Sequence, residues 1–158
     1  MSDRRLPFLG LLVALPVLPQ SAHAERVHET GNVGLGVGGT LFGLGVSGKW
    51  FMNEHNALQG LVGVSNDGDL LFLSPDYLYT FDPLHQEEDV TIDWYGGFGG
   101  TLFMGDSFGL GVNAVLGIDF CIDPAPVDIY AELRPMLFLS PVTEFAFSNF
   151  AGGVRYYF

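Results

Sequence analysis

Seven charged residues lie at alternate positions within otherwise apolar segments of this chain. They are Lys49, Asp93, Asp119, Asp128, Glu132, Arg134 and Arg155. Charges of both signs that share the inner face of a narrow, low-dielectric structure persist only when they are paired. We favour a static ion-pair network that fills the lumen of such a structure. The alternative is a gate in an ion path, formed by Asp93, Glu132, Arg134 and Arg155.

Three further patterns resemble known sites but each lacks a required feature. The segments 34–39 and 43–48 match G-x-G-x-x-G, yet a dinucleotide site needs this turn to open a helix, and apolar alternation continues through both. The acidic run 85–89 lacks the ordered ligand spacing of a cation loop. Cys121 adjoins no base, and no Ser–His pair lies on alternating strand positions. We expect no catalytic residue, no metal and no cofactor, and so no enzyme.

The composition excludes several classes of protein. The chain has 158 residues, 18 acidic and 6 basic, with a net charge of -12, so it has no basic face for nucleic acid. Its single cysteine cannot form a disulfide framework, and 48% apolar residues are too many for a disordered chain. Aromatic residues reach 14% and glycines number 22, about twice the usual share of glycine. One acidic, apolar domain remains.

The first 24 residues have the layout of a secretory signal peptide. Arg4 and Arg5 form a basic start, residues 6–18 an apolar run, and Ala22-His23-Ala24 a cleavage site. The apolar run is too short and too rich in proline to span a membrane as a helix. We therefore expect cleavage after Ala24, which leaves residues 25–158 as the exported domain.

The remaining chain alternates with period two, which is typical of strands. In 108–120, for example, apolar side chains share one face, while glycine, Asn113 and Asp119 share the other. Pro75 and Pro135 fall within expected strands, where they should mark either bulges or errors in the expected strand bounds. Turn-forming residues separate eight expected strands, at 32–41, 44–51, 56–64, 70–81, 90–103, 108–120, 127–139 and 145–158.

One short segment occurs twice. Residues 38–46 have the sequence GGTLFGLGV, and residues 99–112 have GGTLFMGDSFGLGV. The repeat suggests a doubled unit of four strands, although glycine-rich low complexity could produce the same similarity.

The C-terminal segment 153–158 has the sequence GVRYYF. It resembles the C-terminal recognition signal of bacterial outer-membrane β-barrels, with a glycine, an aromatic residue and a terminal aromatic at fixed spacing. Ala151 departs from the polar residue that is usual two positions before the glycine. The resemblance implies that Gly153, Tyr156 and Phe158 form an assembly signal for the barrel-assembly machinery.

Together with the segments 47–51, 56–58 and 69–78, this ending resembles a group of functionally uncharacterised outer-membrane proteins similar to the transmembrane domain of OmpA and to OmpX. The resemblance implies an all-β, eight-stranded antiparallel up-and-down transmembrane β-barrel in the bacterial outer membrane. In hydrocarbon such a sheet must close so that every backbone polar group is paired. The expected partners are outer-membrane lipid and the assembly machinery, with no nucleic acid, and the expected state is a monomer.

We therefore expect a structural or narrow-pore barrel with a charged, largely side-chain-filled lumen, in which inner-face glycines make room for longer side chains. The alternative is a secreted, soluble lipocalin-like barrel that binds an apolar ligand. The two differ in which face of the sheet is apolar. An adhesin is a third class, but the expected outer connections are too short for one.

Overall fold

The structure is a computed structural model that describes residues 27, 29–87, 89–106, 108–122, 125–141 and 143–158. The expected signal peptide, residues 1–24, lies outside the described residues. Within the described part, no helix is long and apolar enough to cross a membrane. The strands of that part are β1 (Val33–Thr40), β2 (Gly43–Phe51), β3 (Asn56–Ser65), β4 (Leu71–Thr80), β5 (His85–Gln86), β6 (Val90–Met104), β7 (Gly109–Ile122), β8 (Val127–Leu133), β9 (Met136–Ser140), β10 (Glu144–Ala146) and β11 (Phe150–Tyr157).

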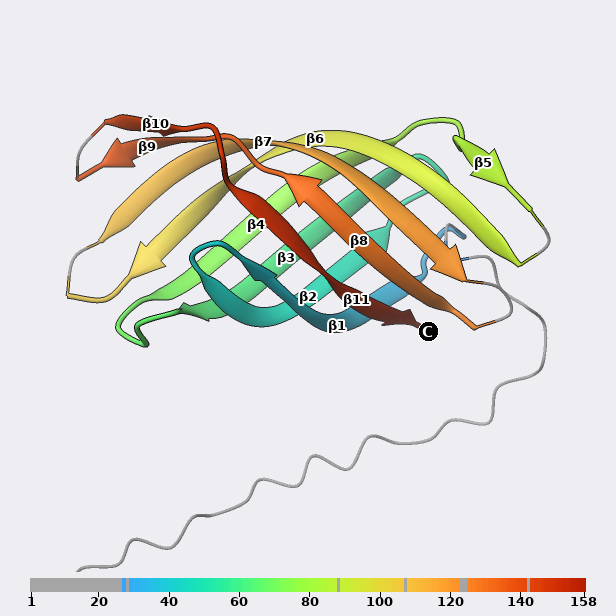
Figure 1. Cartoon of the computed structure of the whole chain (residues 1–158), viewed down its shortest axis with the longest axis horizontal. Coiled ribbons are helices and arrows are strands. Elements are labelled where there is room, and N and C mark those ends of the chain that lie inside the picture. The colour runs from blue at the N-terminus through green and yellow to red at the C-terminus, as the bar shows by residue number, and fades with distance from the viewer. Residues whose placement is uncertain (1–26, 28, 88, 107, 123–124, 142) are drawn as a thin grey trace, which may run out of the picture.

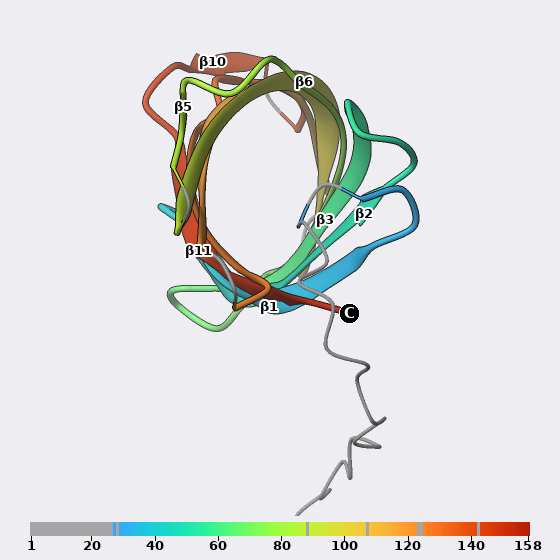
Figure 2. The ribbon, with the colours of Figure 1, turned by 90° about the vertical axis from the view of Figure 1, so that its right-hand side faces the viewer.

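Antiparallel pairing closes the sheet into an eight-stranded barrel. The ring runs from β1 through β2, β3, β4, β6, β7 and β8 to β11, which pairs again with β1. Figure 2 shows this ring viewed along the barrel. The short strands extend it beyond the ring, because β5 pairs with β6, β9 with β7, and β10 with β9. The predicted fold class is confirmed.

The first six predicted strands correspond to β1–β4, β6 and β7, with ends that differ by one or two residues. The last two are each divided in two: 127–139 forms β8 and β9, and 145–158 forms β10 and β11. Arg134 and Pro135 separate β8 from β9, since proline has no backbone N–H to donate to the ladder.

The expected bulge is absent at Pro75, whereas at Pro135 the expected strand is interrupted and the register shifts on one side of the break. Pro75 pairs with Gly60 in a register that stays constant along β3 and β4. The register with β7 is unbroken across Pro135, whose carbonyl accepts the N–H of Ala114 at 3.1 Å. On the other side, three residue steps from Leu133 to Met136 face four steps from Phe150 to Ala146, so one extra residue lies on the β10–β11 side. Pro75 therefore omits a donor without any change of register, whereas the break at Pro135 coincides with a one-residue shift against β10 and β11. A further register shift, in β9, lies opposite Leu110 and Gly111, near the strand end.

Side chains alternate strictly between the inside and the outside of the barrel wall. In β7, Val112, Leu116 and Phe120 are exposed on the outside, whereas Asn113 and Asp119 are buried inside. The other long strands follow the same pattern, so the predicted faces are confirmed. A soluble barrel would bury its apolar face instead, and the polarity of this wall is the reverse.

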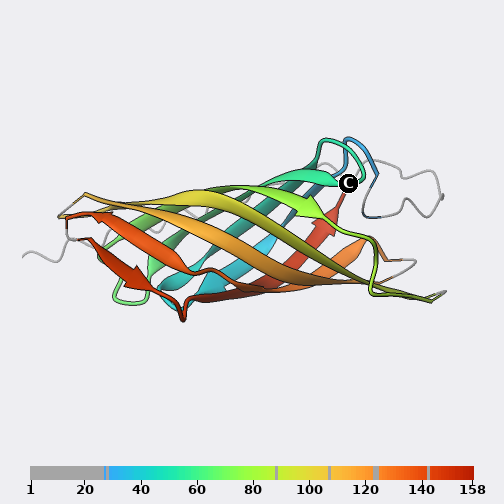
Figure 3. The same cartoon turned by 90° about the horizontal axis from the view of Figure 1, so that it is seen from above.

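The barrel has two ends (Figures 1 and 3). We call one the terminus end: it carries the start of β1, the C-terminus and β5. We call the other the loop end: it carries the connections β1–β2, β3–β4, β6–β7 and β9–β10.

Candidate functional site

All seven charged residues singled out in the sequence lie inside the barrel, and each is at most 5% exposed. Alternation places them there, because each occupies an inward position on β2, β6, β7, β8 or β11, or at the break after β8. Six of them take part in two groups of ion pairs, and Asp93 lies beside Cys121.

The first group, which we call the Arg155 cluster, joins β2, β7, β8 and β11. Lys49 Nζ lies 2.5 Å from Asp119 Oδ2, and Arg155 Nη2 lies 3.2 Å from Asp119 Oδ1. The same guanidinium contacts Asp128 Oδ2 at 3.0 Å, and the Tyr157 hydroxyl donates to this carboxylate at 2.6 Å. Asp119 thus bridges the two cations, and Asp128 is held by a cation and a phenol.

Aromatic rings cover both cations of this cluster. Lys49 Nζ lies 4.4 Å from the centre of the Tyr95 ring and 4.9 Å from that of Phe51. The Arg155 guanidinium lies 4.0 Å from the centre of the Tyr130 ring. Ring faces attract cations most strongly where water is excluded, so these contacts add to the ion pairs.

The second group, which we call the Arg134 cluster, joins β4, β6, β7 and β8. Arg134 contacts Asp76 Oδ2 at 2.5 Å and Glu132 Oε2 at 2.9 Å, and it donates to the Ser74 hydroxyl at 2.8 Å. Asn113 Nδ2 donates to the other oxygen of Asp76 at 2.8 Å. Ser74 in turn lies 2.9 Å from the hydroxyl of Thr101.

Gln59 on β3 connects the two clusters. Its amide nitrogen donates to Glu132 Oε1 at 2.7 Å, and its amide oxygen accepts from Arg155 Nη1 at 2.5 Å. Tyr95 also donates to Glu132 Oε1, at 2.7 Å. These polar contacts therefore join side chains from β2, β3, β4, β6, β7, β8 and β11, which are all the strands of the ring except β1.

Asp93 adjoins the Arg155 cluster, because it interacts electrostatically with Asp119 and Lys49. It is buried on β6, opposite Asp119 in the pairing with β7, and the Cys121 thiol donates to its carboxylate over 3.9 Å. The four residues considered as a gate do not form a single ion-pair group. Arg134 pairs with Glu132, whereas Arg155 pairs with Asp119 and Asp128.

Several members of these clusters were not predicted from the sequence. Asp76, Gln59 and Ser74 were not singled out, although each lies at the centre of the network. In β4 both faces carry apolar residues, so the pattern did not reveal which residues face inward. Alternation could have identified Gln59, because it lies two residues from both Ala57 and Leu61 and so shares their strand face. All three residues are buried inside the barrel.

Glycines on the wall provide the space that the inner aromatic rings occupy. A Cβ added to Gly34 would lie 2.6 Å from the Tyr157 ring, and one added to Gly117 would overlap the Tyr95 ring even more closely. Both distances are too short for real atoms, so these rings require glycine on the facing wall.

The remaining motifs lie outside the two clusters. The G-x-G-x-x-G matches form parts of β1 and β2. His85 Nε2 contacts Glu87 at 3.0 Å in an exposed pair, and the His55 ring lies 5.6 Å from that of Tyr79, both at the terminus end.

Comparison with known proteins gives one structural likeness. No family model matches the chain, and no curated protein matches it in sequence. A solved structure does match: the N-terminal β-barrel domain of Pseudomonas aeruginosa OprF, with a TM-score of 0.59. The chain has the fold of the OprF barrel.

The likeness to OprF spans 82% of this chain and 98% of the OprF domain, at 18% sequence identity. It confirms, at the level of the fold, the resemblance to OmpA-like outer-membrane barrels that the C-terminal segment and the alternation indicated.

Proposed function

We propose that this chain is a monomeric outer-membrane β-barrel protein with a structural role, whose interior is filled by the Arg155 and Arg134 clusters. The observation that carries the proposal is the polarity of the wall: charged side chains are buried inside and apolar ones are exposed outside. Bulk water would expose this apolar surface at a high cost, whereas lipid accepts it.

The outer surface is suited to a bilayer along its whole height. Four valines on neighbouring strands, Val154, Val37, Val46 and Val62, are paired side by side and face outward. Near the terminus end, aromatic residues gather at the surface, and the Phe81 and Trp94 rings stack at 4.1 Å. An apolar band flanked by aromatic residues is typical of transmembrane barrels.

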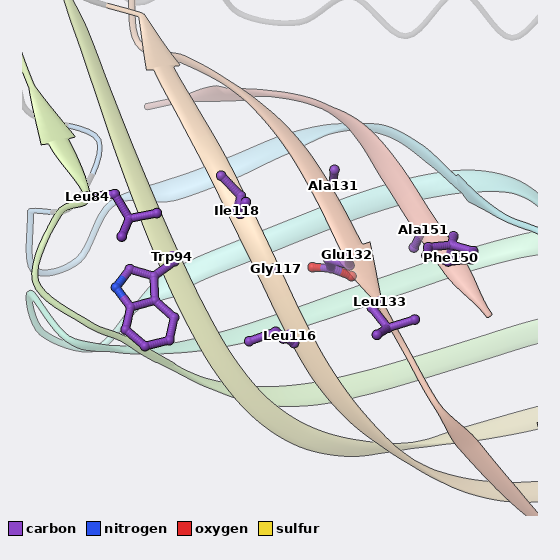
Figure 4. Close-up of a pocket in the computed structure, with 10 residues that line it drawn as sticks. All are labelled: Leu84, Trp94, Leu116, Gly117, Ile118, Ala131, Glu132, Leu133, Phe150 and Ala151. Atoms are coloured by element: carbon purple, nitrogen blue, oxygen red, sulfur yellow. The ribbon is translucent and has the colours of Figure 1, made fainter. Parts of the chain in front are cut away.

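An outward-facing hollow of about 570 Å³ also fits a lipid environment. It crosses β6, β7, β8 and β11, and Trp94, Leu116, Ile118, Leu133 and Phe150 form much of its lining (Figure 4). The apolar lining suits an acyl chain. The fold shared with the N-terminal β-barrel domain of OprF also supports a membrane barrel.

The proposal is tested by expressing the full chain in a Gram-negative host and fractionating the membranes. We expect the protein in the outer membrane, and we expect the unheated sample to migrate faster than the boiled one on a gel. Recovery of the protein in the soluble fraction, with the same gel mobility before and after boiling, would contradict the proposal and favour the lipocalin-like alternative.

A narrow cation path is a second candidate, favoured by the charge of the interior. The buried ionisable carboxylates in the described part of the strands and their break are Asp76, Asp93, Asp119, Asp128 and Glu132, whereas the buried cations there are Lys49, Arg134 and Arg155. An excess of acidic groups attracts cations and repels anions. Planar-bilayer recording of the wild type beside Arg155→Ala and Glu132→Ala tests it. A cation-selective current altered by either substitution supports a path, and no current in any of the three supports a filled lumen.

A further inference from the structure

Three phenylalanine rings close over one another inside the loop end of the barrel. Phe42 lies 5.9 Å from Phe103 and 6.2 Å from Phe138, and Phe103 lies 5.8 Å from Phe138. We call these three rings the phenylalanine cap. Phe42 and Phe103 are the equivalent residues of the two copies of GGTLF, so the repeated segments bring their phenylalanines together.

The cap lies beyond the ion pairs, toward the loop end. Inward positions on the chain from β8 to β9 run in the order Glu132, Arg134, Met136 and Phe138. Two such steps, each about 6.6 Å along a strand, separate Phe138 from Arg134. No part of the Arg134 cluster described above includes a cap ring, so the cap is a separate apolar layer.

A pocket of about 270 Å³ opens at this layer. The rings of the cap line it together with Phe108, Leu70 and Pro141. The wall is held in place, because the backbone N–H of Asn66 donates to the carbonyl of Phe42 at 2.8 Å. Apolar cavities of about 150 Å³ already hold a benzene molecule, so this pocket has room for one ring and a bulky substituent.

The charges around the pocket are all of one sign among the described residues. Asp69 precedes Leu70, Asp106 lies two residues before Phe108, and Glu144 pairs with Phe138 across β9 and β10. All three carboxylates are exposed. Every lysine and arginine in the described part is buried inside the barrel, so the rim has no cation to balance them.

We propose that the loop-end pocket binds a small hydrophobic organic cation: an ammonium group carried on a single aromatic ring or a short alkyl body. The faces of aromatic rings attract ammonium groups, and the acidic rim attracts cations and repels anions. A neutral molecule of the same shape would gain the apolar contacts alone. This site is separate from the proposed structural role, and its occupation does not depend on ion conduction.

The test uses the full-length mature chain folded in a non-ionic maltoside detergent, with benzyltrimethylammonium as the probe. Neopentylbenzene is its neutral isostere, and benzenesulfonate is the anionic comparison. Binding is followed by amide chemical shifts in NMR spectra, after subtraction of partitioning into protein-free micelles. We expect the cation to shift the signals of Gly109 and Ser140, to bind several-fold more tightly than the isostere, and the sulfonate not to bind.

Two variants and their matched controls test the residues. Phe103→Leu should weaken cation binding at least threefold, because it removes one ring face and keeps an apolar side chain. Phe145→Leu, at an outward-facing ring of β10, should not change it. Asp106→Asn combined with Glu144→Gln alters only exposed groups and should reduce the preference for the cation over the isostere, whereas Glu87→Gln at the terminus end should not.

Each opposite result overturns the proposal. An isostere that binds as tightly as the cation shows a general apolar cavity. Shifts confined to residues outside the loop end show binding elsewhere. An unchanged preference in the double carboxylate variant, which does not touch the barrel interior, contradicts the role of the rim even if Phe103→Leu fails to fold.

Discussion

Replacing Arg155 by methionine is the sharpest test of whether the ion pairs stabilise the barrel. Arg155 is fully buried, and its guanidinium contacts Asp119 at 3.2 Å and Asp128 at 3.0 Å. Methionine keeps a long apolar side chain against the Tyr130 ring and removes the charge. Asp119 retains Lys49 at 2.5 Å, so the main consequence falls on Asp128, which keeps the Tyr157 hydroxyl.

The expected loss of stability follows from what happens when one partner of a buried ion pair is removed. Removing one partner leaves the other charge buried without its counterion, which costs about 3–5 kcal/mol. The Tyr157 hydrogen bond reduces this cost, so we expect Arg155→Met to lower the free energy of unfolding by about 3 kcal/mol. Adding Asp128→Asn removes the isolated charge. The double variant should therefore be destabilised by at least about 1.5 kcal/mol less than the sum of the losses measured for the two single variants.

The measurement is reversible urea unfolding of the barrel in lipid vesicles, followed by its heat-dependent gel mobility. Glu87→Gln is the matched control, because its exposed pair with His85 spans 3.0 Å and should contribute about 1 kcal/mol or less. A loss below about 1 kcal/mol for Arg155→Met would refute the reasoning. So would strict additivity of the Arg155 and Asp128 variants, since it would show that the two residues do not interact.

Three further predictions concern the wall of the barrel. Val37, 68% exposed near the middle of β1, faces lipid in the proposed setting, so Val37→Arg should lower the unfolding free energy in vesicles by about 2–4 kcal/mol; no loss would favour an aqueous surface. Gly34→Ala should lower the free energy of unfolding by about 1–3 kcal/mol in the same urea titration, because the added methyl group overpacks against Tyr157. Gly60→Ala, where an added Cβ meets nothing within 4 Å, should not lower it. Deleting Phe158 should reduce the outer-membrane yield in cells while refolding of the purified chain in vesicles stays unchanged; equal loss in both assays would make Phe158 a packing residue only.

The barrel itself was predictable because period two is a direct consequence of strand geometry. In β7 each inward residue is buried and each outward residue except the half-buried Leu110 is exposed. No tertiary information is needed to place Asn113 and Asp119 on the same face. The same argument predicted which faces of β6, β8 and β11 point inward.

The partners of each charge were not predictable from that pattern. Alternation determines the face of a residue but not its height relative to residues on other strands. Height depends on the stagger accumulated across every pair of strands in the ring. Lys49 and Asp119 lie on strands that are not neighbours, and their 2.5 Å contact requires the correct register at each intervening pair.

The small elements escaped prediction for a different reason. β5 has two residues and β10 has three, too few for a period to be recognised. At Arg134 and Pro135 the sequence left a bulge and a strand end as alternatives, because proline removes an N–H donor in both cases. The structure shows a strand break whose register with β7 is continuous, from Leu133–Leu116 to Met136–Asn113. On the β10–β11 side, the register shifts by one residue between Phe150 and Ala146.

The buried charges also bear on how this sequence specifies one register. A slip of one residue between neighbouring strands turns every side chain of the displaced strand to the opposite face. For β8, such a slip would move Asp128 and Glu132 from the interior to the outer surface. In lipid each charge would then lose its partner and meet hydrocarbon, and the outward apolar residues would enter the polar interior. The observed register is the one in which strand pairing, ion pairing and the outer apolar surface are all satisfied together, so mispaired barrels should be disfavoured more strongly than an apolar lumen would allow.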